Sequence, residues 1–189
     1  MYANRFTVVL DANVLGPVLP RNILLSLASA ELFRPRWSAQ VLEEAERFIA
    51  RKTGNDSNAR DQRKRIERAF PEGIVRIATA SEQRLSLPDE NDRHVLAAAI
   101  KVRAQLIVTD NLRDFPNDVL AEFEMEAISA DHFIADTMTL DLTRSIASIA
   151  QMRARFSHPK LTPQHLVLRC EKSGLLETAS ILSEHANLI

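Results

Sequence analysis

The chain contains little of several residue types on which common classes of site depend. Its 189 residues include one cysteine, Cys170, which excludes an internal disulfide and a zinc site built from cysteines. Only 4 glycines occur, so a glycine-rich loop around a nucleotide phosphate is not expected. No apolar run approaches the roughly 20 residues that a membrane-spanning helix needs, and the first residues do not form a signal-peptide pattern. We therefore expect a cytoplasmic protein that makes no contact with a membrane.

The composition is that of a folded globular protein. Hydrophobic residues make up 46% of the chain and charged residues 26%, which argues against disorder. The formal net charge of −1 is unevenly distributed. Residues 47–80 carry 9 basic and 4 acidic side chains, whereas residues 81–143 carry 5 basic and 13 acidic ones. An acidic centre beside a basic segment fits an enzyme that binds metals with carboxylates and phosphates with Lys and Arg, although solvated helix faces would give the same pattern.

Strand and helix patterns alternate along the first two thirds of the chain. Short apolar runs at 6–10 and 106–109 predict buried strands, and each is followed by an aspartate. Weaker strand patterns occur at 74–77 and 126–128, with helical patterns between the strands. This alternation predicts an α/β domain over residues 1–136, in which helices cover both faces of a central parallel sheet. The pattern of residues 137–189 predicts a C-terminal helical extension.

Two groups of polar residues follow the two clear strands. Asp11 and Asn13 follow the first strand, and Asp110, Asn111 and Asp114 follow the second. Ligands collect at the carboxyl ends of the strands in parallel sheets, so these residues are candidates for a site. Asp11 alone would equally suit a helix cap. The segment leaves open whether Asp110 or Asp114 takes part, and Asn13 is expected to support the turn.

Two further acidic groups lie on predicted helices. Glu44 lies beside the apolar stripe of a helix that begins after Ser38, and Asp89 and Asp92 share a face in the first turn of another helix. Taken singly, each suits a surface position or a favourable interaction with the helix dipole. His94 follows Asp92 by two positions, so we expect it to face elsewhere on that helix, and we assign it no catalytic role.

Taken together, the acids predict a metal site. Carboxylates gathered at one sheet edge repel one another unless a cation neutralises them. Oxygen ligands without histidines at ligand spacing suit Mg²⁺ or Mn²⁺ better than zinc. One or two such ions can activate water for phosphodiester hydrolysis.

The order of the motifs LDANVL, SxxVLxE, DENDRHVLAAA and VTDNLRDF resembles the PIN-domain ribonucleases, in particular the VapC-type toxins of bacterial toxin–antitoxin pairs. The resemblance covers roughly residues 5–135 and implies a PIN-like three-layer α/β/α fold with a central parallel sheet. It places Asp11, Glu44 and Asp92 on the family's metal-binding acids. Either Asp110 or Asp114 is the fourth, and Asp89 matches an acid found in part of the family. Residues 137–189 are similar to the helical extension of one VapC subgroup.

The resemblance also implies a function and partners. Such toxins cut structured RNA, often a tRNA or ribosomal RNA, are silenced by a cognate antitoxin protein, and commonly form homodimers. The alternative is a catalytically inert PIN-like module that binds nucleic acid or acts as an adaptor. A haloacid-dehalogenase phosphatase fits poorly, because Asn13 stands where that family has a second aspartate. The candidates for gripping the RNA backbone are the basic residues of the predicted second and third helices: Arg47, Arg51, Lys52, Arg60, Arg63, Lys64, Arg65 and Arg68.

Overall fold

The computed structural model describes residues 6–78, 85–156 and 160–189. The chain packs as two compact units, each described here by itself. Unit 1 comprises Met1–Pro17 and Phe33–Ser129, and unit 2 comprises Val18–Leu32 and Ala130–Ile189. The packing therefore groups residues 18–32 with the C-terminal helices, and the domain boundary expected at residue 136 stays a prediction.

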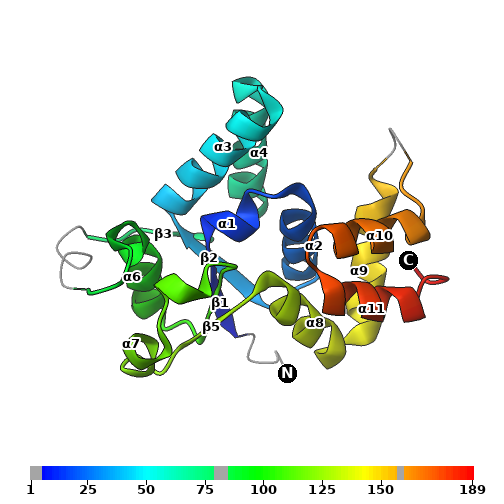
Figure 1. Ribbon diagram of the computed structural model, residues 1–189. Coiled ribbons are helices and arrows are strands. Elements are labelled where there is room, and N and C mark those ends of the chain that lie inside the picture. The colour runs from blue at the N-terminus through cyan, green and yellow to red at the C-terminus, as the bar shows by residue number, and fades with distance from the viewer. Residues whose placement is uncertain (1–5, 79–84, 157–159) are drawn as a thin grey trace. The chain divides into compact units, whose positions relative to one another are not determined.

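A parallel sheet forms the centre of unit 1 (Figure 1). Its five strands lie in the order β3-β2-β1-β4-β5, and every adjacent pair is parallel. The strands are β1 (Thr7–Leu10), β2 (Arg34–Ser38), β3 (Ile74–Val75), β4 (Leu106–Val108) and β5 (Glu126–Ile128). Leu10 is in register with Val108, so β1 and β4 end at the same level of the sheet. The predicted α/β/α class with a central parallel sheet is confirmed.

Helices and short 3₁₀ turns connect the strands of unit 1 along the chain. They are α1 (Ala12–Leu15), α3 (Ala39–Thr53), α4 (Asp56–Ala69), η1 (Glu90–Asp92), α6 (Arg93–Val102), η2 (Leu112–Asp114) and α7 (Asn117–Ala121). Helix α3 begins where the Ser38 hydroxyl accepts a hydrogen bond from Val41 N and ends at Gly54, whose φ of +64° favours glycine. Helix α6 packs on β1, β2 and β4 through a buried apolar run from Val95 to Ala99.

Strand β2 is the main element that the sequence pattern did not predict. It reads Arg34-Pro35-Arg36-Trp37-Ser38, and both proline and alternating arginines are unusual in an interior parallel strand. The strand is nevertheless central because Pro35 and Trp37 are buried and β2 pairs with both β1 and β3. Gly73 permits this packing, since a Cβ there would lie 2.5 Å from Cζ2 of Trp37.

Unit 2 is helical throughout the part that the structure describes. It consists of α2 (Val18–Ser29), α8 (Ala130–Leu140), α9 (Leu142–Ala154), α10 (Pro163–Lys172) and α11 (Leu176–Glu184). Asp131 of α8 accepts hydrogen bonds at 2.9 Å from the backbone N–H groups of Glu177 and Thr178, which satisfies the first turn of α11. Cys170 is fully buried. Across the described residues, no helix combines the length and apolar character needed to cross a bilayer.

Candidate metal centre

Asp11 is a buried carboxylate at the carboxyl end of β1, with only 4% of the residue exposed. Its Oδ1 accepts from Ala12 N at 2.6 Å, so it caps α1. Its Oδ2 accepts from the Thr109 hydroxyl at 2.8 Å and from Nδ2 of Asn13 at 2.7 Å. Burial raises the pKa of Asp11, and the charge of Glu44 raises it further, while the hydrogen bonds from Thr109 and Ala12 oppose the rise. Asp11 can therefore cap α1 and also take part in the site.

Thr109 and Asn13 join the ends of β1 and β4. The fully buried Thr109 hydroxyl donates to Asp11 and accepts from Asn13 Nδ2 at 2.8 Å and from Asn111 N at 3.1 Å. Oδ1 of Asn13 accepts from Asp110 N at 3.1 Å. The turn-supporting role expected for Asn13 thus has a physical basis, and it extends to the neighbouring strand. The sequence pattern did not indicate Thr109, because threonine is a common β-branched residue at the end of a strand.

Three further carboxylates converge beside Asp11. One oxygen each from Asp89, Asp92 and Asp114 lies within 4.8 Å of the other two. The pKa of Asp92 is raised to about 7, first by burial and then by the negative charges of Asp11, Asp89 and Asp114. The acids come from three stretches of chain: Asp11 follows β1, Asp89 and Asp92 precede α6, and Asp114 ends η2. The fold therefore brings together acids that are up to 103 positions apart in the sequence.

Glu44 approaches the same region from α3, and a buried histidine contacts it. Nε2 of His94 lies 3.5 Å from Oε1 of Glu44, and Nε2 of Gln40 donates to that oxygen at 2.9 Å. Burial opposes ionisation of Glu44, but the close contact with His94, the hydrogen bond from Gln40 and the charge of Arg47 outweigh it and lower the pKa. His94 is 3% exposed, and its Nδ1 lies 2.7 Å from the Ser38 hydroxyl. The imidazole of His94 thus faces Glu44, an acid on another helix.

Asp92 and His94 belong to different elements, although they are two positions apart. Asp92 ends the 3₁₀ turn η1, whereas His94 lies in the first turn of α6. A count of positions along one regular helix therefore does not relate the directions of the two side chains. The apolar run that follows, which buries Val95 and its neighbours, would have indicated that this turn faces inward.

The two candidates for the fourth acid differ in position. Asp114 belongs to the acidic cluster, with 15% of its side chain exposed, and the Asn111 amide donates to its Oδ2. Asp110 is exposed and contributes its backbone N–H to Asn13. Asp11, Asp92 and Asp114 therefore supply buried or half-buried carboxylate oxygens, and the charges of Asp11 and Asp114 act on Asp92. Nε of Arg113 lies 4.0 Å from Oδ1 of Asp114, and the Arg113 side chain is 87% exposed. Such a set of carboxylates fits a hard divalent cation.

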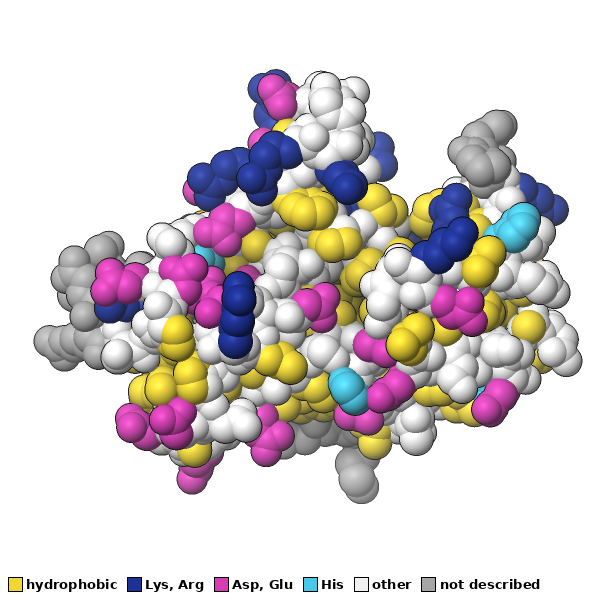
Figure 2. Space-filling view, viewed as in Figure 1, with side chains coloured by type: hydrophobic (Ala, Val, Ile, Leu, Met, Phe, Trp, Pro, Cys, Tyr) yellow, Lys and Arg dark blue, Asp and Glu magenta, His cyan; other side chains and the backbone are white. Residues whose placement is uncertain are grey.

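The predicted RNA-binding residues lie on α3 and α4, and Arg47 among them lies 4.0 Å from Oε1 of Glu44. Figure 2 shows Lys and Arg side chains over these two helices, and Asp and Glu side chains near the start of α6. Arg63 differs from the rest, because its guanidinium contacts Glu67 at 2.9 Å and Glu46 at 3.2 Å and so ties α4 to α3. The exposed members are Arg47, Arg51, Lys52, Arg60, Lys64, Arg65 and Arg68.

Comparison with known proteins gives two family matches. The PIN domain family matches residues 7–113, and the VapC50 C-terminal domain family matches residues 130–184. A protein from Mycobacterium tuberculosis with the name "Putative ribonuclease VapC50" is 41% identical over 76 residues, which cover 40% of this chain and 45% of that protein. The aligned part thus spans less than half of that relative. No solved structure matches the chain. Because the first match covers more than half of its length, the chain belongs to the PIN-domain family.

Proposed function

We propose that the chain is a Mg²⁺- or Mn²⁺-dependent endoribonuclease in which Asp11, Glu44, Asp92 and Asp114 form the metal site. The convergence of carboxylates on Asp92 carries this proposal. Burial and then the charges of three neighbouring acids raise the pKa of Asp92 to about 7, and a divalent cation would relieve the repulsion among these carboxylates. Such a cluster has no evident benefit for folding, because the repulsion works against the folded state.

Three of the four acids have a neighbour that sets their orientation. Thr109 and Asn13 fix Asp11, the Asn111 amide contacts Asp114, and His94 contacts Glu44. Asp89 lies within the cluster and supports it, while its own Oδ1 accepts from Asn91 N at 2.9 Å. When bound, one or two ions would supply charge neutralisation and a lowered pKa for the attacking water. No side-chain nucleophile is required of the protein.

Basic residues beside Glu44 are our candidates for holding the RNA. Glu44, Arg47, Ala50 and Arg51 line a cavity of about 470 Å³ on one side of α3. The exposed arginines on this face can bind phosphate oxygens while Glu44 takes part in the metal site. The other exposed basic residues of α3 and α4 would extend the same surface. Arg63 remains a predicted RNA-binding residue. Its ion pairs with Glu43, Glu46 and Glu67 make it the least suited of the set to bind a phosphate.

The family and the named relative suggest the biological role. We propose that the protein acts in the cytoplasm as the toxin of a bacterial type II toxin–antitoxin pair, cleaving structured RNA such as tRNA or rRNA. A cognate antitoxin would cover the acidic cluster, and a homodimer is part of the proposal. Production of the chain alone should slow bacterial growth, and production together with the protein encoded by the neighbouring small gene should restore it. Normal growth without that partner would contradict the toxin role while leaving the nuclease chemistry open.

The central test is a substitution within the acidic cluster. Asp92→Asn removes a charge from a side chain that makes no capping hydrogen bond. We expect Mg²⁺-dependent cleavage of total RNA to fall by more than about 100-fold, because changes around a metal ligand alone cost about 10- to 100-fold. Asp118→Asn is the matched control, because Asp118 is exposed on α7 and lies outside the cluster.

The outcome separates the nuclease from the inert alternative. Cleavage by Asp92→Asn at the rate of the unchanged chain would refute the metal-site assignment. Binding of RNA by the unchanged chain, with no cleavage at any Mg²⁺ or Mn²⁺ concentration, would instead favour the inert binding or adaptor module.

A further inference from the structure

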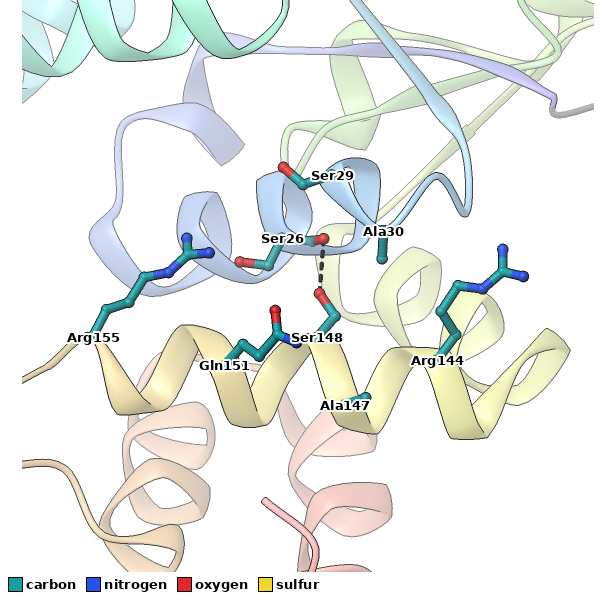
Figure 3. A pocket seen from close by; sticks show the side chains of 8 residues that line it. All are labelled: Ser26, Ser29, Ala30, Arg144, Ala147, Ser148, Gln151 and Arg155. Atoms are coloured by element: carbon teal, nitrogen blue, oxygen red, sulfur yellow. Dashed lines mark hydrogen bonds between the residues drawn. The ribbon is translucent and has the colours of Figure 1, made fainter.

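Unit 2 contains a polar groove between α2 and α9 that the proposed metal centre does not use (Figure 3). It has a volume of about 280 Å³. Both helices contribute small or polar side chains to it, so the two backbones approach closely. The lining residues are Ser26, Ser29, Ala30, Arg144, Ala147, Ser148, Gln151 and Arg155.

Two arginines mark the ends of this groove. Arg144 and Arg155 are 11 positions apart on α9, which is about three turns, so both point to the same side of the helix. At about 1.5 Å per residue, their Cα atoms are about 16 Å apart along the axis. Figure 3 shows the two guanidinium groups at opposite ends of the groove, with Ser148 and Gln151 between them.

Both arginines are available to a ligand. Arg144 is 54% exposed, and Asp141 holds its Nε at 3.5 Å, which orients the guanidinium without enclosing it. Arg155 is exposed and forms no side-chain ion pair with any residue that the structure describes. The groove therefore presents two positive charges with no acid among its lining residues.

The floor between the arginines favours a ligand that donates hydrogen bonds. The Ser148 hydroxyl donates to Ser26 O at 2.8 Å, and the Ser29 hydroxyl donates to Leu25 O at 2.8 Å. Because both protons are engaged, each oxygen offers the groove an acceptor. The ribose 2′-OH is a donor that RNA has and DNA lacks.

We propose that this groove binds the ribose–phosphate backbone of RNA. Arg144 and Arg155 contact phosphates, and the Ser29 and Ser148 oxygens accept from ribose hydroxyls. A stacked strand advances about 3.4 Å per phosphate, so the arginines span about five nucleotides. An acidic protein segment fits less well, because protein partners bind mainly through apolar anchors and the lining of this groove offers alanine as its only apolar side chain. The inference rests on the proposed function, because it assigns unit 2 a part in holding the substrate.

The test measures binding without cleavage. A labelled 12-nucleotide single-stranded RNA and its DNA counterpart are titrated with the full chain in EDTA, and fluorescence anisotropy gives Kd at several salt concentrations. The test variant is Arg144→Gln with Arg155→Gln. The matched control is Arg169→Gln with Lys172→Gln, which removes two exposed charges of α10, in the same unit but outside the groove. A third variant, Ala147→Glu, places a carboxylate on the exposed floor of the groove.

We expect the test variant to bind RNA about 10- to 30-fold more weakly at about 0.1 M salt, with a salt slope lower by about 1.4, because each lost phosphate contact removes about 0.7 from the slope for a single strand. Ala147→Glu should weaken binding similarly, the control should bind like the unchanged chain, and RNA should bind more tightly than DNA.

Three results would overturn the proposal. They are equal Kd values for the test and control variants, equal affinity for RNA and DNA, and displacement of the RNA by polyglutamate at equal charge concentration, which would point to an acidic protein partner. Because EDTA prevents cleavage, none of these results depends on whether Asp92→Asn abolishes the nuclease activity.

Discussion

The imidazole of His94 bridges Ser38 and Glu44, with Nδ1 at 2.7 Å from the Ser38 hydroxyl and Nε2 at 3.5 Å from Oε1 of Glu44. The Ser38 oxygen already accepts from Val41 N, so its own proton is available to Nδ1. In that arrangement Nε2 carries the hydrogen that faces Glu44. One buried side chain thereby links the start of α3, the start of α6 and a candidate metal ligand.

This link predicts that His94 positions Glu44. His94→Leu removes the contact, and we expect metal affinity and kcat to fall by about 10- to 100-fold, the range for neighbours of metal ligands. His94→Gln places an amide near the former Nε2 and should recover part of the loss. Calorimetric titration with Mn²⁺ and single-turnover cleavage measure the two effects. Equal metal affinity in His94→Leu and the unchanged chain would show that the contact only fills space.

The raised pKa of Asp92 predicts how stability depends on pH in the absence of metal. An Asp92 pKa of about 7 in the folded chain, against 3.8 for an unperturbed aspartate, means that the folded state holds a proton between these values that the unfolded state has released. The contribution of Asp92 to the free energy of unfolding should therefore be fully present below about pH 4. It should be lost as the pH rises through about 7. Urea unfolding in EDTA measures this slope.

The matched comparison for that experiment is Asp92→Asn. It should flatten the fall in stability between about pH 5 and 8, whereas Asp118→Asn should leave the fall unchanged. Added Mg²⁺ should stabilise the unchanged chain more at about pH 8 than at about pH 5, because protons compete with the cation for the carboxylates. The same slope in Asp92→Asn as in the unchanged chain would mean that other groups dominate the titration.

Sequence patterns predicted the parts of the fold that follow from local rules. The apolar runs before Asp11 and Asp110 are strands, and Ser38 begins a helix as expected for a capping residue. Strand β2 was not predictable from its own residues. Its place in the sheet depends on the burial of Pro35 and Trp37, which tertiary packing decides and local propensity does not.

The site shows the same division. The family resemblance and the strand ends selected Asp11 and Asp92 and left Asp110 and Asp114 as alternatives, and the structure brings Asp11, Asp92 and Asp114 close together. The structure adds two contacts that residue spacing does not predict. Thr109 donates a hydrogen bond to Asp11, and His94 lies close to Glu44. These contacts join residues 98 and 50 positions apart, so no local pattern indicates them.

Thr109 gives a test of the hydrogen bonds behind Asp11. Thr109→Val keeps the shape of the side chain but removes the donor to Asp11 and the acceptor for Asn13 and Asn111. We expect a loss of about 1–3 kcal/mol in the free energy of unfolding, because buried polar groups lose their partner, together with a loss of metal affinity. Thr109→Ser keeps the hydroxyl and should retain most of the metal affinity. A fully active Thr109→Val would show that Asp11 is held well enough by Ala12 and Asn13.

The choice between Asp110 and Asp114 as the fourth acid yields the sharpest pair of variants. Asp114 has an oxygen within 4.8 Å of those of Asp89 and Asp92 and is part of the repulsion that raises the pKa of Asp92. Asp110 is exposed and contributes its backbone N–H to Asn13, a contact that any residue at this position retains. Asp114→Asn should therefore lower cleavage by more than about 100-fold, a larger effect than the loss of an outer neighbour, and should also lower the pKa of Asp92.

Asp110→Asn should keep cleavage within a few-fold of the unchanged chain, and it makes the same chemical change four positions earlier. NMR titration of the Asp92 carboxyl carbon, alongside the cleavage assay, checks both effects in each variant. In Asp114→Asn, the loss of one carboxylate removes both a metal ligand and a negative charge beside Asp92. The drop in activity and the drop in the Asp92 pKa must therefore occur in the same variant. If they separated, with activity lost in Asp110→Asn and the pKa shifted in Asp114→Asn, the acid that crowds Asp92 would not be the acid that the reaction needs.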